Sequence, residues 1–217
     1  MIKVVCFDLG GVLLSTAERW QEAIHVAGVN SSLSKDDNRS FYALPAFCAH
    51  QRGDLPYADY LAELRDAFGL DSVESADLVH RSILVKPYVG TVRLIEDLKK
   101  LGLVTGCLSN TDPVHWVELT RSGRFPAVEM IDIQLGSHLI GCAKPNPFAY
   151  RAFDKASGYS GLQTVFFDDN QANVDVAREI GWFAHSVHGP TGQVNQMRLH
   201  LASYGLAIEP SFASSPK

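Results

Sequence analysis

The chain has 217 residues, of which 46% are apolar and 20% are charged. At roughly 100–200 residues per domain, this length suits one domain or one domain with an insertion, and the composition excludes collagen-like, disordered and disulfide-stapled chains. The formal net charge is −5, and no block of Lys or Arg could follow a nucleic-acid backbone. We therefore expect no nucleic-acid partner. Only the last residues, Pro210 to Lys217, have the composition of a disordered tail.

The four cysteines are far apart and lack the CxxC spacing of a redox or metal site. They are Cys6, Cys48, Cys107 and Cys142. Cys6 and Cys107 lie in apolar runs, where a thiol behaves as a small hydrophobe. The first apolar stretch is interrupted by Asp8, and no run approaches the roughly 18 residues of a membrane span. These features predict reduced cysteines and a cytoplasmic protein with no membrane partner.

Three apolar runs predict the strands of a parallel sheet. Ile2 to Phe7, Leu103 to Leu108 and Thr164 to Phe167 are nearly continuously apolar, as is typical of strands covered on both faces. Helical spacing of apolar residues over Thr91 to Leu101 and Asn173 to Ile180 alternates with these runs. The pattern predicts an α/β fold with a Rossmann-like, doubly wound parallel sheet, which binds ligands at the carboxyl ends of its strands.

A long interval from Ser15 to about Val85 separates the first two predicted strands. It is too long for an ordinary crossover. Helical spacing over Arg19 to Ala27 and Ala58 to Phe68 indicates an inserted helical cap above the carboxyl edge of the sheet. The predicted division is an α/β core of residues 1–14 and 86–217 and a helical cap of residues 15–85.

Polar residues follow the first two predicted strands. Asp8 ends the first strand, and the glycines Gly10 and Gly11 behind it allow backbone amides to approach an anion. A carboxylate in this position can attack phosphorus, although the pattern also suits a plain strand end with a glycine turn. Ser109 and Asn110 follow the second strand, where they could hold phosphate oxygens or cap a helix.

The later part of the chain supplies a lysine and an acidic pair. Lys144 precedes Pro145 and could bridge a carboxylate and a phosphate, or lie on the surface as isolated lysines usually do. Asp168 and Asp169 leave the third strand together, and adjacent carboxylates repel one another unless a cation is present. With Asp8 they suit a hard ion with oxygen ligands, and the expected ion is Mg²⁺.

Four segments together carry a resemblance to a known family. FDLGGVLL, LSNT, AKPNPFAY and FFDDNQANVDVAREIGW occur in the order and spacing typical of the haloacid dehalogenase superfamily. The chain resembles members with a helical cap inserted after the first motif, and the resemblance covers nearly the whole chain. The DLGG variant and the SNTxxxH continuation are similar to the branch of alpha-D-glucose-1-phosphate phosphatases and the N-terminal phosphatase domains of epoxide hydrolases.

The resemblance implies a two-step phosphoryl transfer in which Asp8 forms an aspartyl phosphate that water then hydrolyses. Lys144, the second implied catalytic residue, would neutralise charge around the transferring group. The implied magnesium ligands are Asp8, the Gly10 carbonyl, Asp168 and Asp169. The implied phosphate-binding groups are Gly10, Gly11, Ser109, Asn110 and Lys144.

One position departs from the family pattern. Most phosphatases of this superfamily carry a second Asp, a general acid and base, where this chain has Gly10. General acid–base catalysis contributes roughly 10²–10⁴-fold, so its loss favours a good leaving group, as in an anomeric sugar phosphate or acyl phosphate, or a proton donor from the cap. His50 and Arg52 lie in a polar cap turn and are the predicted substrate residues, although a solvated loop is the commoner role for residues in such a turn. His115 is interpreted as structural or as a support behind the site residues.

The leading prediction is a magnesium-dependent phosphatase, monomeric or homodimeric, whose substrate is a small phosphorylated metabolite such as a sugar phosphate. A 2-haloacid dehalogenase shares the nucleophile but does not use magnesium, so the Asp168–Asp169 pair disfavours it. A non-catalytic phosphate-binding or scaffold protein is the third hypothesis, and Gly10 permits it.

Overall fold

The computed structural model describes residues 1–34, 37–189, 192–206 and 208. The disordered tail predicted for Pro210 to Lys217 lies outside the described residues. Within the described ranges, no helix combines the length and the apolar character needed to cross a membrane.

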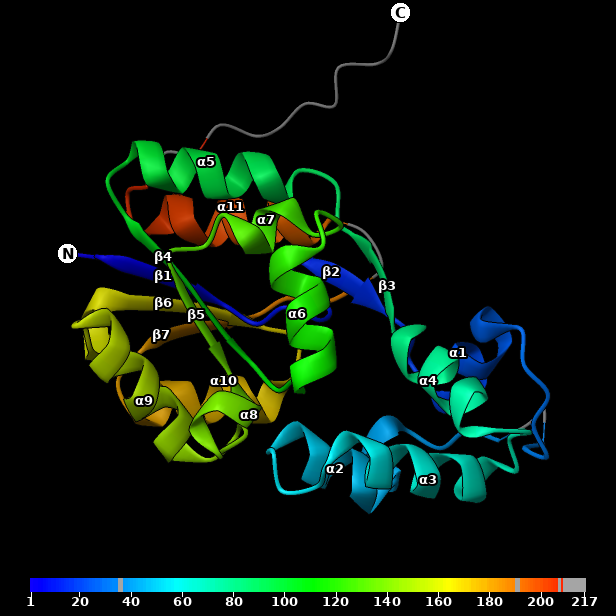
Figure 1. The fold of residues 1–217 in the computed structure, drawn as a ribbon. Helices are drawn as coiled ribbons and strands as arrows, with labels where there is room; N and C mark the ends of the chain where they lie inside the picture. The colour runs from blue at the N-terminus through cyan, green and yellow to red at the C-terminus, as the bar shows by residue number, and fades with distance from the viewer. Residues whose placement is uncertain (35–36, 190–191, 207, 209–217) are drawn as a thin grey trace, which may run out of the picture.

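A five-stranded parallel sheet forms the centre of the molecule (Figure 1). The strand order is β5 (Ile133–Gly136), β4 (Val104–Ser109), β1 (Val4–Phe7), β6 (Thr164–Asp168) and β7 (Phe183–Ser186). Every neighbouring pair runs parallel. The three strands predicted from apolar runs are the three central ones, since only central strands are covered on all sides. The α/β class and the parallel sheet are thus confirmed.

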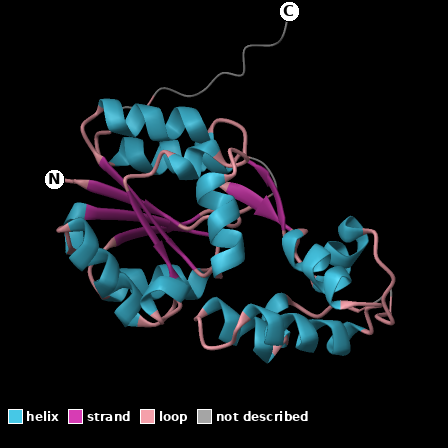
Figure 2. Cartoon of the chain, viewed as in Figure 1, coloured by secondary structure: helices cyan, strands magenta, loops and turns pink. Residues whose placement is uncertain are grey.

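Helices cover both faces of the sheet, as Figure 2 shows in its layers. One face carries α5 (Thr91–Lys100), α7 (Pro126–Glu129) and α11 (Gln193–Ser203), and the other carries α8 (Ser137–Ile140), α9 (Pro147–Ser157) and α10 (Gln171–Glu179). Each side has its own apolar cluster. Leu94, Leu98 and Met197 are buried against the first face, and Tyr150 and Phe153 against the second. The sheet is therefore doubly wound.

The inserted segment is helical and begins and ends in a pair of strands. Strand β2 (Leu14–Thr16) pairs antiparallel with β3 (Leu84–Pro87), so the predicted division at residues 15 and 85 passes through this strand pair. Between the two strands lie α1 (Trp20–Ala27), the 3-10 helix η1 (Phe41–Ala43), α2 (Pro45–Gln51), α3 (Tyr57–Phe68) and α4 (Val73–Arg81). These helices bury a separate apolar cluster that includes Trp20, Tyr60 and Leu64. Cap and sheet therefore have separate cores.

Two helices beside the carboxyl edge begin in the same way. Asp112 caps α6 (Pro113–Arg121), and its side chain accepts hydrogen bonds from Val114 N and His115 N. Asn146 caps α9 and accepts a hydrogen bond from Phe148 N. Both caps are followed by Pro, whose fixed φ suits the first helical position. These caps fix the loops that precede them, which are the loops after Ser109 and Lys144.

Candidate active site

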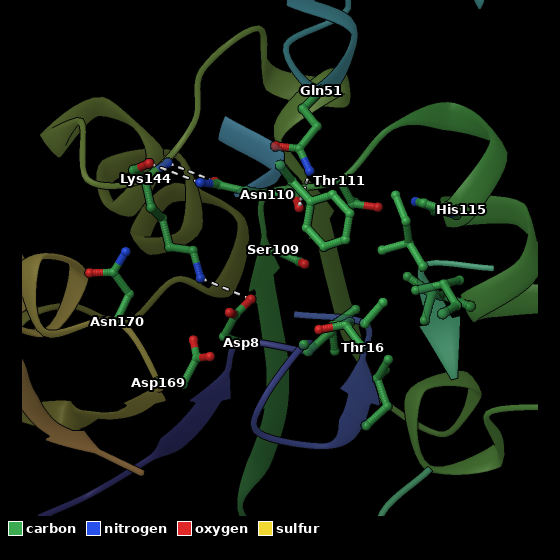
Figure 3. A pocket seen from close by; sticks show the side chains of 18 of the residues that line it. Asp8, Thr16, Gln51, Ser109, Asn110, Thr111, His115, Lys144, Asp169 and Asn170 are labelled. Carbon is green, nitrogen blue, oxygen red and sulfur yellow. Dashed lines mark hydrogen bonds and ion pairs between the residues drawn. The ribbon is translucent and has the colours of Figure 1, made fainter. Parts of the chain in front are cut away.

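A cavity of about 500 Å³ lies between the carboxyl edge of the sheet and the cap. The sheet side contributes polar residues, among them Asp8, Ser109, Lys144 and Asp169. The cap side contributes mainly aromatic and aliphatic residues. Figure 3 shows the polar side chains converging from different elements. They meet because β4 and β6 flank β1 in register, which places the three strand ends side by side.

Lys144 forms the centre of the polar group. Its Nζ lies 3.0 Å from Asp8 Oδ1 and 2.6 Å from Asp168 Oδ2, and its side chain is 1% exposed. Burial lowers the pKa of Lys144, but the attraction of Asp168 and Asp8 outweighs burial and raises that pKa above its usual value. The lysine therefore remains a charged donor that holds two carboxylates in place.

The two acids at the end of β6 differ in their surroundings. Asp168 is fully buried, and both of its oxygens have partners, because Lys144 binds Oδ2, Asn170 N donates to Oδ1 and Asn173 Nδ2 donates to both. Asp169 lines the cavity. Burial and the neighbouring Asp168 raise the pKa of Asp169. Asp168 thus orients Lys144, whereas Asp169 faces the space in which a ligand would lie.

Asp8 has a strongly perturbed pKa. Burial, followed by repulsion from Asp168 and Asp169, raises its pKa to about 7, although Lys144 acts in the opposite direction. Oxygens of these three carboxylates lie within 4.8 Å of one another, and a single ammonium faces them. When all three acids are ionised, the cluster has three negative charges and only the one positive charge of Lys144. Three hard oxygen donors with a charge deficit fit a divalent ion of the Mg²⁺ type.

The loop after β4 positions the lysine and the cap. The Asn110 side chain accepts from Lys144 N (2.8 Å) and donates to Lys144 O (2.9 Å), so it clamps the lysine backbone. Gln51 Nε2 donates to Asn110 O (3.2 Å), which joins the cap to the same loop. Ser109 is 5% exposed and lines the cavity. Both residues of this loop that were predicted to bind phosphate, Ser109 and Asn110, line the cavity, and the amide of Asn110 also holds the Lys144 backbone.

The two glycines after Asp8, Gly10 and Gly11, differ in position and contacts. Gly10 lines the cavity. Gly11 N donates to Leu14 O (2.8 Å), so this amide already has a partner and the expectation that it binds phosphate is corrected. Gly11 has φ 72°, and a Cβ there would lie 2.2 Å from Asp169 Oδ2. Glycine at position 11 therefore permits the close approach of Asp169 to the loop that follows β1.

Neither predicted cap residue lines the cavity. His50 is 2% exposed, its Nδ1 donates to Leu55 O, and its ring stacks on Tyr60. Arg52 is exposed and pairs with Asp54 at 2.8 Å. We therefore assign neither residue to the substrate site, because one is packed inside the cap and the other points to solvent. His50 and Gln51 are the last residues of α2 and not part of a turn, and Gln51 is the residue of this segment that lines the cavity.

The cavity lining includes cap residues that sequence reasoning missed. Phe41, Tyr42 and Phe47 come from η1 and α2. Their spacing is also that of ordinary core residues of a small helical bundle, so no sequence signal separates the two roles.

A second buried polar cluster joins cap and sheet. We call it the cap–core joint: Asp112, His115, His80 and His50. Asp112 Oδ2 lies 2.9 Å from His115 Nδ1, and its Oδ1 lies 3.3 Å from His80 Nε2 and 3.7 Å from His50 Nε2. His80 Nδ1 lies 3.1 Å from the Tyr60 hydroxyl. One carboxylate of the core is thus surrounded by side chains of α2, α4 and α6.

The joint has balanced charge. Both ring nitrogens of His115 face oxygens, since Nε2 lies 2.9 Å from His80 O, and this favours the imidazolium form. Burial raises the pKa of Asp112, but His115 and His80 outweigh burial and hold that pKa well below its usual value. Burial and the neighbouring His115 lower the pKa of His80 to about 4, so His80 is neutral. The structural role predicted for His115 agrees with this geometry.

The sequence matches the family of haloacid dehalogenase-like hydrolases over residues 2–181. The chain belongs to this family and is a hydrolase. It is 25% identical over 198 residues to the D-ribitol-5-phosphate phosphatase of Bacteroides thetaiotaomicron, covering 84% of this chain and 90% of that protein. It is 30% identical over 135 residues to a phosphatase of Mycobacterium tuberculosis. That match spans 61% of each chain.

Solved structures show the same architecture. A HAD family enzyme of Bacteroides thetaiotaomicron, in complex with magnesium and inorganic phosphate, superposes with a TM-score of 0.71 and 25% identity, covering 88% of this chain and 96% of that one. The L-2-haloacid dehalogenase of Xanthobacter autotrophicus superposes with a TM-score of 0.63 and 18% identity, covering 100% of this chain and 93% of that one. The second likeness extends to the fold alone.

Proposed function

We propose that this hydrolase is a Mg²⁺-dependent phosphomonoesterase that acts on a small phosphate ester through an aspartyl phosphate on Asp8. The observation that carries the proposal is the geometry of Asp8, whose carboxylate faces the cavity 3.0 Å from Lys144 Nζ with Ser109 and Asp169 beside it. Relatives named as phosphatases, and a neighbour of the same fold that binds magnesium and phosphate, support this choice over other hydrolase reactions.

Covalent catalysis begins at the Asp8 carboxylate. One of its oxygens attacks phosphorus, the bond from phosphorus to the ester oxygen breaks, and that oxygen leaves with the bonding electrons and takes a proton from solvent water to become the alcohol. Water then attacks the same phosphorus and gives up a proton to solvent, the bond between phosphorus and Asp8 breaks, and inorganic phosphate leaves with Asp8 regenerated. The Lys144 ammonium and the Ser109 side chain are placed to stabilise charge on the phosphate oxygens during both steps.

Asp8, Asp169 and the Gly10 carbonyl would hold the magnesium ion, since all three residues line the cavity. The ion, when bound, supplies positive charge to the phosphate oxygens and to the carboxylates that surround it. Asp168 keeps Lys144 in reach of Asp8 through its 2.6 Å contact, so we assign it a positioning role. This division of labour refines the prediction that all three acids are ligands.

A 2-haloacid dehalogenase would use the same nucleophile on a substrate that is itself a carboxylate. The Asp169 carboxylate lines the cavity in addition to Asp8, and Lys144 is already paired with two acids. Without a divalent cation, a carboxylate substrate would be repelled by this arrangement. The acidic lining therefore favours phosphate esters bound together with magnesium.

The test is hydrolysis of acetyl phosphate and p-nitrophenyl phosphate, with phosphate release measured in Mg²⁺ and in chelator. We expect release in Mg²⁺, no release in chelator and full recovery when Mg²⁺ is restored. Chloride release from 2-chloropropionate serves as the control for the dehalogenase reaction and is expected to be absent. Failure to release phosphate from either compound in saturating Mg²⁺ would overturn the proposal.

A further inference from the structure

The space that an acidic side chain at position 10 would enter is occupied by another side chain. An ideal Cβ on Gly10 would lie 3.2 Å from Thr16 Cγ2, so the Thr16 methyl occupies the direction in which an acidic side chain would extend. Glu18, the remaining acid of the lining besides Asp8 and Asp169, is solvent-exposed in the described structure. The alcohol therefore has to leave without a buried acid beside the nucleophile.

The side of the cavity formed by the cap, β2, β3 and α6 is mainly apolar. Its apolar side chains are Leu14, Ala17, Phe41, Phe47, Ile83, Leu84 and, from α6, Leu119, and its polar ones are Thr16, Glu18, Tyr42, Gln51 and His115. The polar amide of Gln51 on this side already donates to Asn110 O. We call the side chains of Leu14, Phe41, Phe47, Ile83, Leu84 and Leu119 the apolar wall. A polyol such as a sugar would leave hydroxyl groups without partners against this wall, and each unpaired buried hydroxyl costs about 1–3 kcal/mol. An apolar alcohol gains free energy from the same surface.

The aromatic part of the wall is held rigidly from behind. The rings of Phe41 and Trp20 meet edge to face with centroids 4.8 Å apart, and those of Phe41 and Phe47 are 5.6 Å apart. Trp20 is fully buried, so it fixes the position of Phe41. A preorganised aromatic surface favours another ring, because offset or edge-to-face contacts add to the energy of burial.

Charge excludes a second anionic group on the substrate. Among the described residues that line the cavity, Lys144 is the only Lys or Arg. Its ammonium is engaged by Asp8 and Asp168. The imidazolium of His115 also lines the cavity, and its two ring nitrogens are engaged by Asp112 Oδ2 and His80 O. A carboxylate or second phosphate on the alcohol would therefore be placed near acids without a free cation to receive it.

These observations favour one class of alcohol as the leaving group of the phosphate ester. The inference rests on the proposed phosphatase function. We propose that the substrate is a monophosphate ester of an uncharged aromatic alcohol, with the phosphate on a phenolic oxygen. The phenolic oxygen explains how the reaction proceeds without an acid at Gly10, because a phenol ionises at about pKa 10, compared with about 16 for water. The ring explains the wall around Phe41.

The first test uses the unaltered protein with three phosphate esters and one acyl phosphate in saturating Mg²⁺. 1-Naphthyl phosphate and 4-carboxyphenyl phosphate have leaving groups of similar acidity and differ in charge, D-ribitol 5-phosphate represents polyols, and acetyl phosphate reports the chemistry without a ring. We expect kcat/KM for naphthyl phosphate to exceed that for the carboxyphenyl ester about tenfold or more, and that for ribitol phosphate about 100-fold or more.

The second test changes the wall. Phe41→Gln should lower the ratio of kcat/KM for naphthyl phosphate to that for acetyl phosphate about tenfold. Phe148→Gln is the matched control, since Phe148 is 68% exposed and lies outside the cavity lining, and it should leave the ratio unchanged. The ester series does not depend on either variant folding.

The outcomes separate the two proposals. If acetyl phosphate is hydrolysed but ribitol phosphate or the carboxyphenyl ester matches naphthyl phosphate, the substrate class is wrong and the phosphatase function stands. If none of the four compounds releases phosphate, the phosphatase function itself is wrong. An equal drop in the ratio for Phe41→Gln and Phe148→Gln would also reject the aromatic wall.

Discussion

Two clusters of acidic side chains lie near the loop that follows β4, and they differ in how their charges are balanced. At the cavity, the carboxylates of Asp8, Asp168 and Asp169 face one ammonium. In the cap–core joint, the single carboxylate of Asp112 is surrounded by three imidazoles. The first cluster has more negative than positive charge, whereas the second is balanced by its own side chains.

The comparison shows how the charge balance of a cluster distinguishes a ligand-binding site from a structural cluster. The pKa of Asp8 is raised to about 7 by burial and by its acidic neighbours, so its ionised form is disfavoured until a cation binds. The pKa of Asp112 is held low although burial opposes this, because His115 and His80 already satisfy it. An unbalanced cluster is open to a ligand, and a balanced one stabilises the fold.

Removing the charge of Asp8, the proposed nucleophile, should have the largest effect. Asp8→Asn should lower kcat for acetyl phosphate by about 10⁴-fold or more, because an amide does not form the acyl phosphate. The metal-free variant should be no less stable than the wild type, since ionised Asp8 is disfavoured in the fold. Single-turnover phosphate release and urea unfolding measure the two effects. Wild-type turnover in the variant would contradict the covalent mechanism.

The corresponding Asp-to-Asn change in the cap–core joint should destabilise the protein. Asp112→Asn keeps a residue that caps α6 but leaves the His115 cation buried without its partner, so the free energy of unfolding should fall by about 3–5 kcal/mol. Asp54→Asn, which breaks the exposed pair with Arg52, is the control and should stay within about 0.5 kcal/mol. Equal losses in the two variants, measured by urea unfolding, would remove the distinction between the clusters.

Magnesium affinity should depend on pH through Asp8. Its pKa in the metal-free protein is about 7, so below pH 7 a proton competes with the ion. The Kd for Mg²⁺ should rise as pH falls, by up to about tenfold, or about 1.4 kcal/mol, for each unit below 7, and should be level above it. Calorimetric titrations from pH 5.5 to 8.5 measure this, and the Asp8→Asn variant supplies the baseline. A Kd that stays constant between pH 5.5 and 7 would show that Asp8 does not bind the ion.

Much of the fold and the polar half of the site could be predicted from the sequence. The strands that end at Asp8, Ser109 and Asp168 are nearly continuous apolar runs, and these runs are confirmed as β1, β4 and β6. The edge strands β5 and β7 were not predicted, because they are only partly buried and have a weaker apolar pattern. Lys144 was predicted beside the acids from its motif, and its ammonium does contact Asp8.

The cap half of the site could not be predicted in the same way. Helical spacing shows which residues of a helix are buried, but it does not show against which partner they pack. His50 and Gln51 are neighbours in α2, yet His50 packs inside the cap and Gln51 reaches Asn110, 59 residues away in sequence. Phe41 and Phe47 have the spacing of core residues and also line the cavity.

The sequence by itself determined the strand ends and the acids that follow them, because a buried parallel strand needs continuous apolar residues and its polar end residues meet at one edge. Only the tertiary structure decided which of these polar side chains are already hydrogen-bonded or ion-paired within the protein. The Asn110 amide is occupied by the backbone of Lys144, the oxygens of Asp168 are occupied by Lys144 and Asn173, and Asp112 is paired with histidines of two cap helices. These pairings depend on distances between segments far apart in the chain, which packing of the cap against the sheet sets.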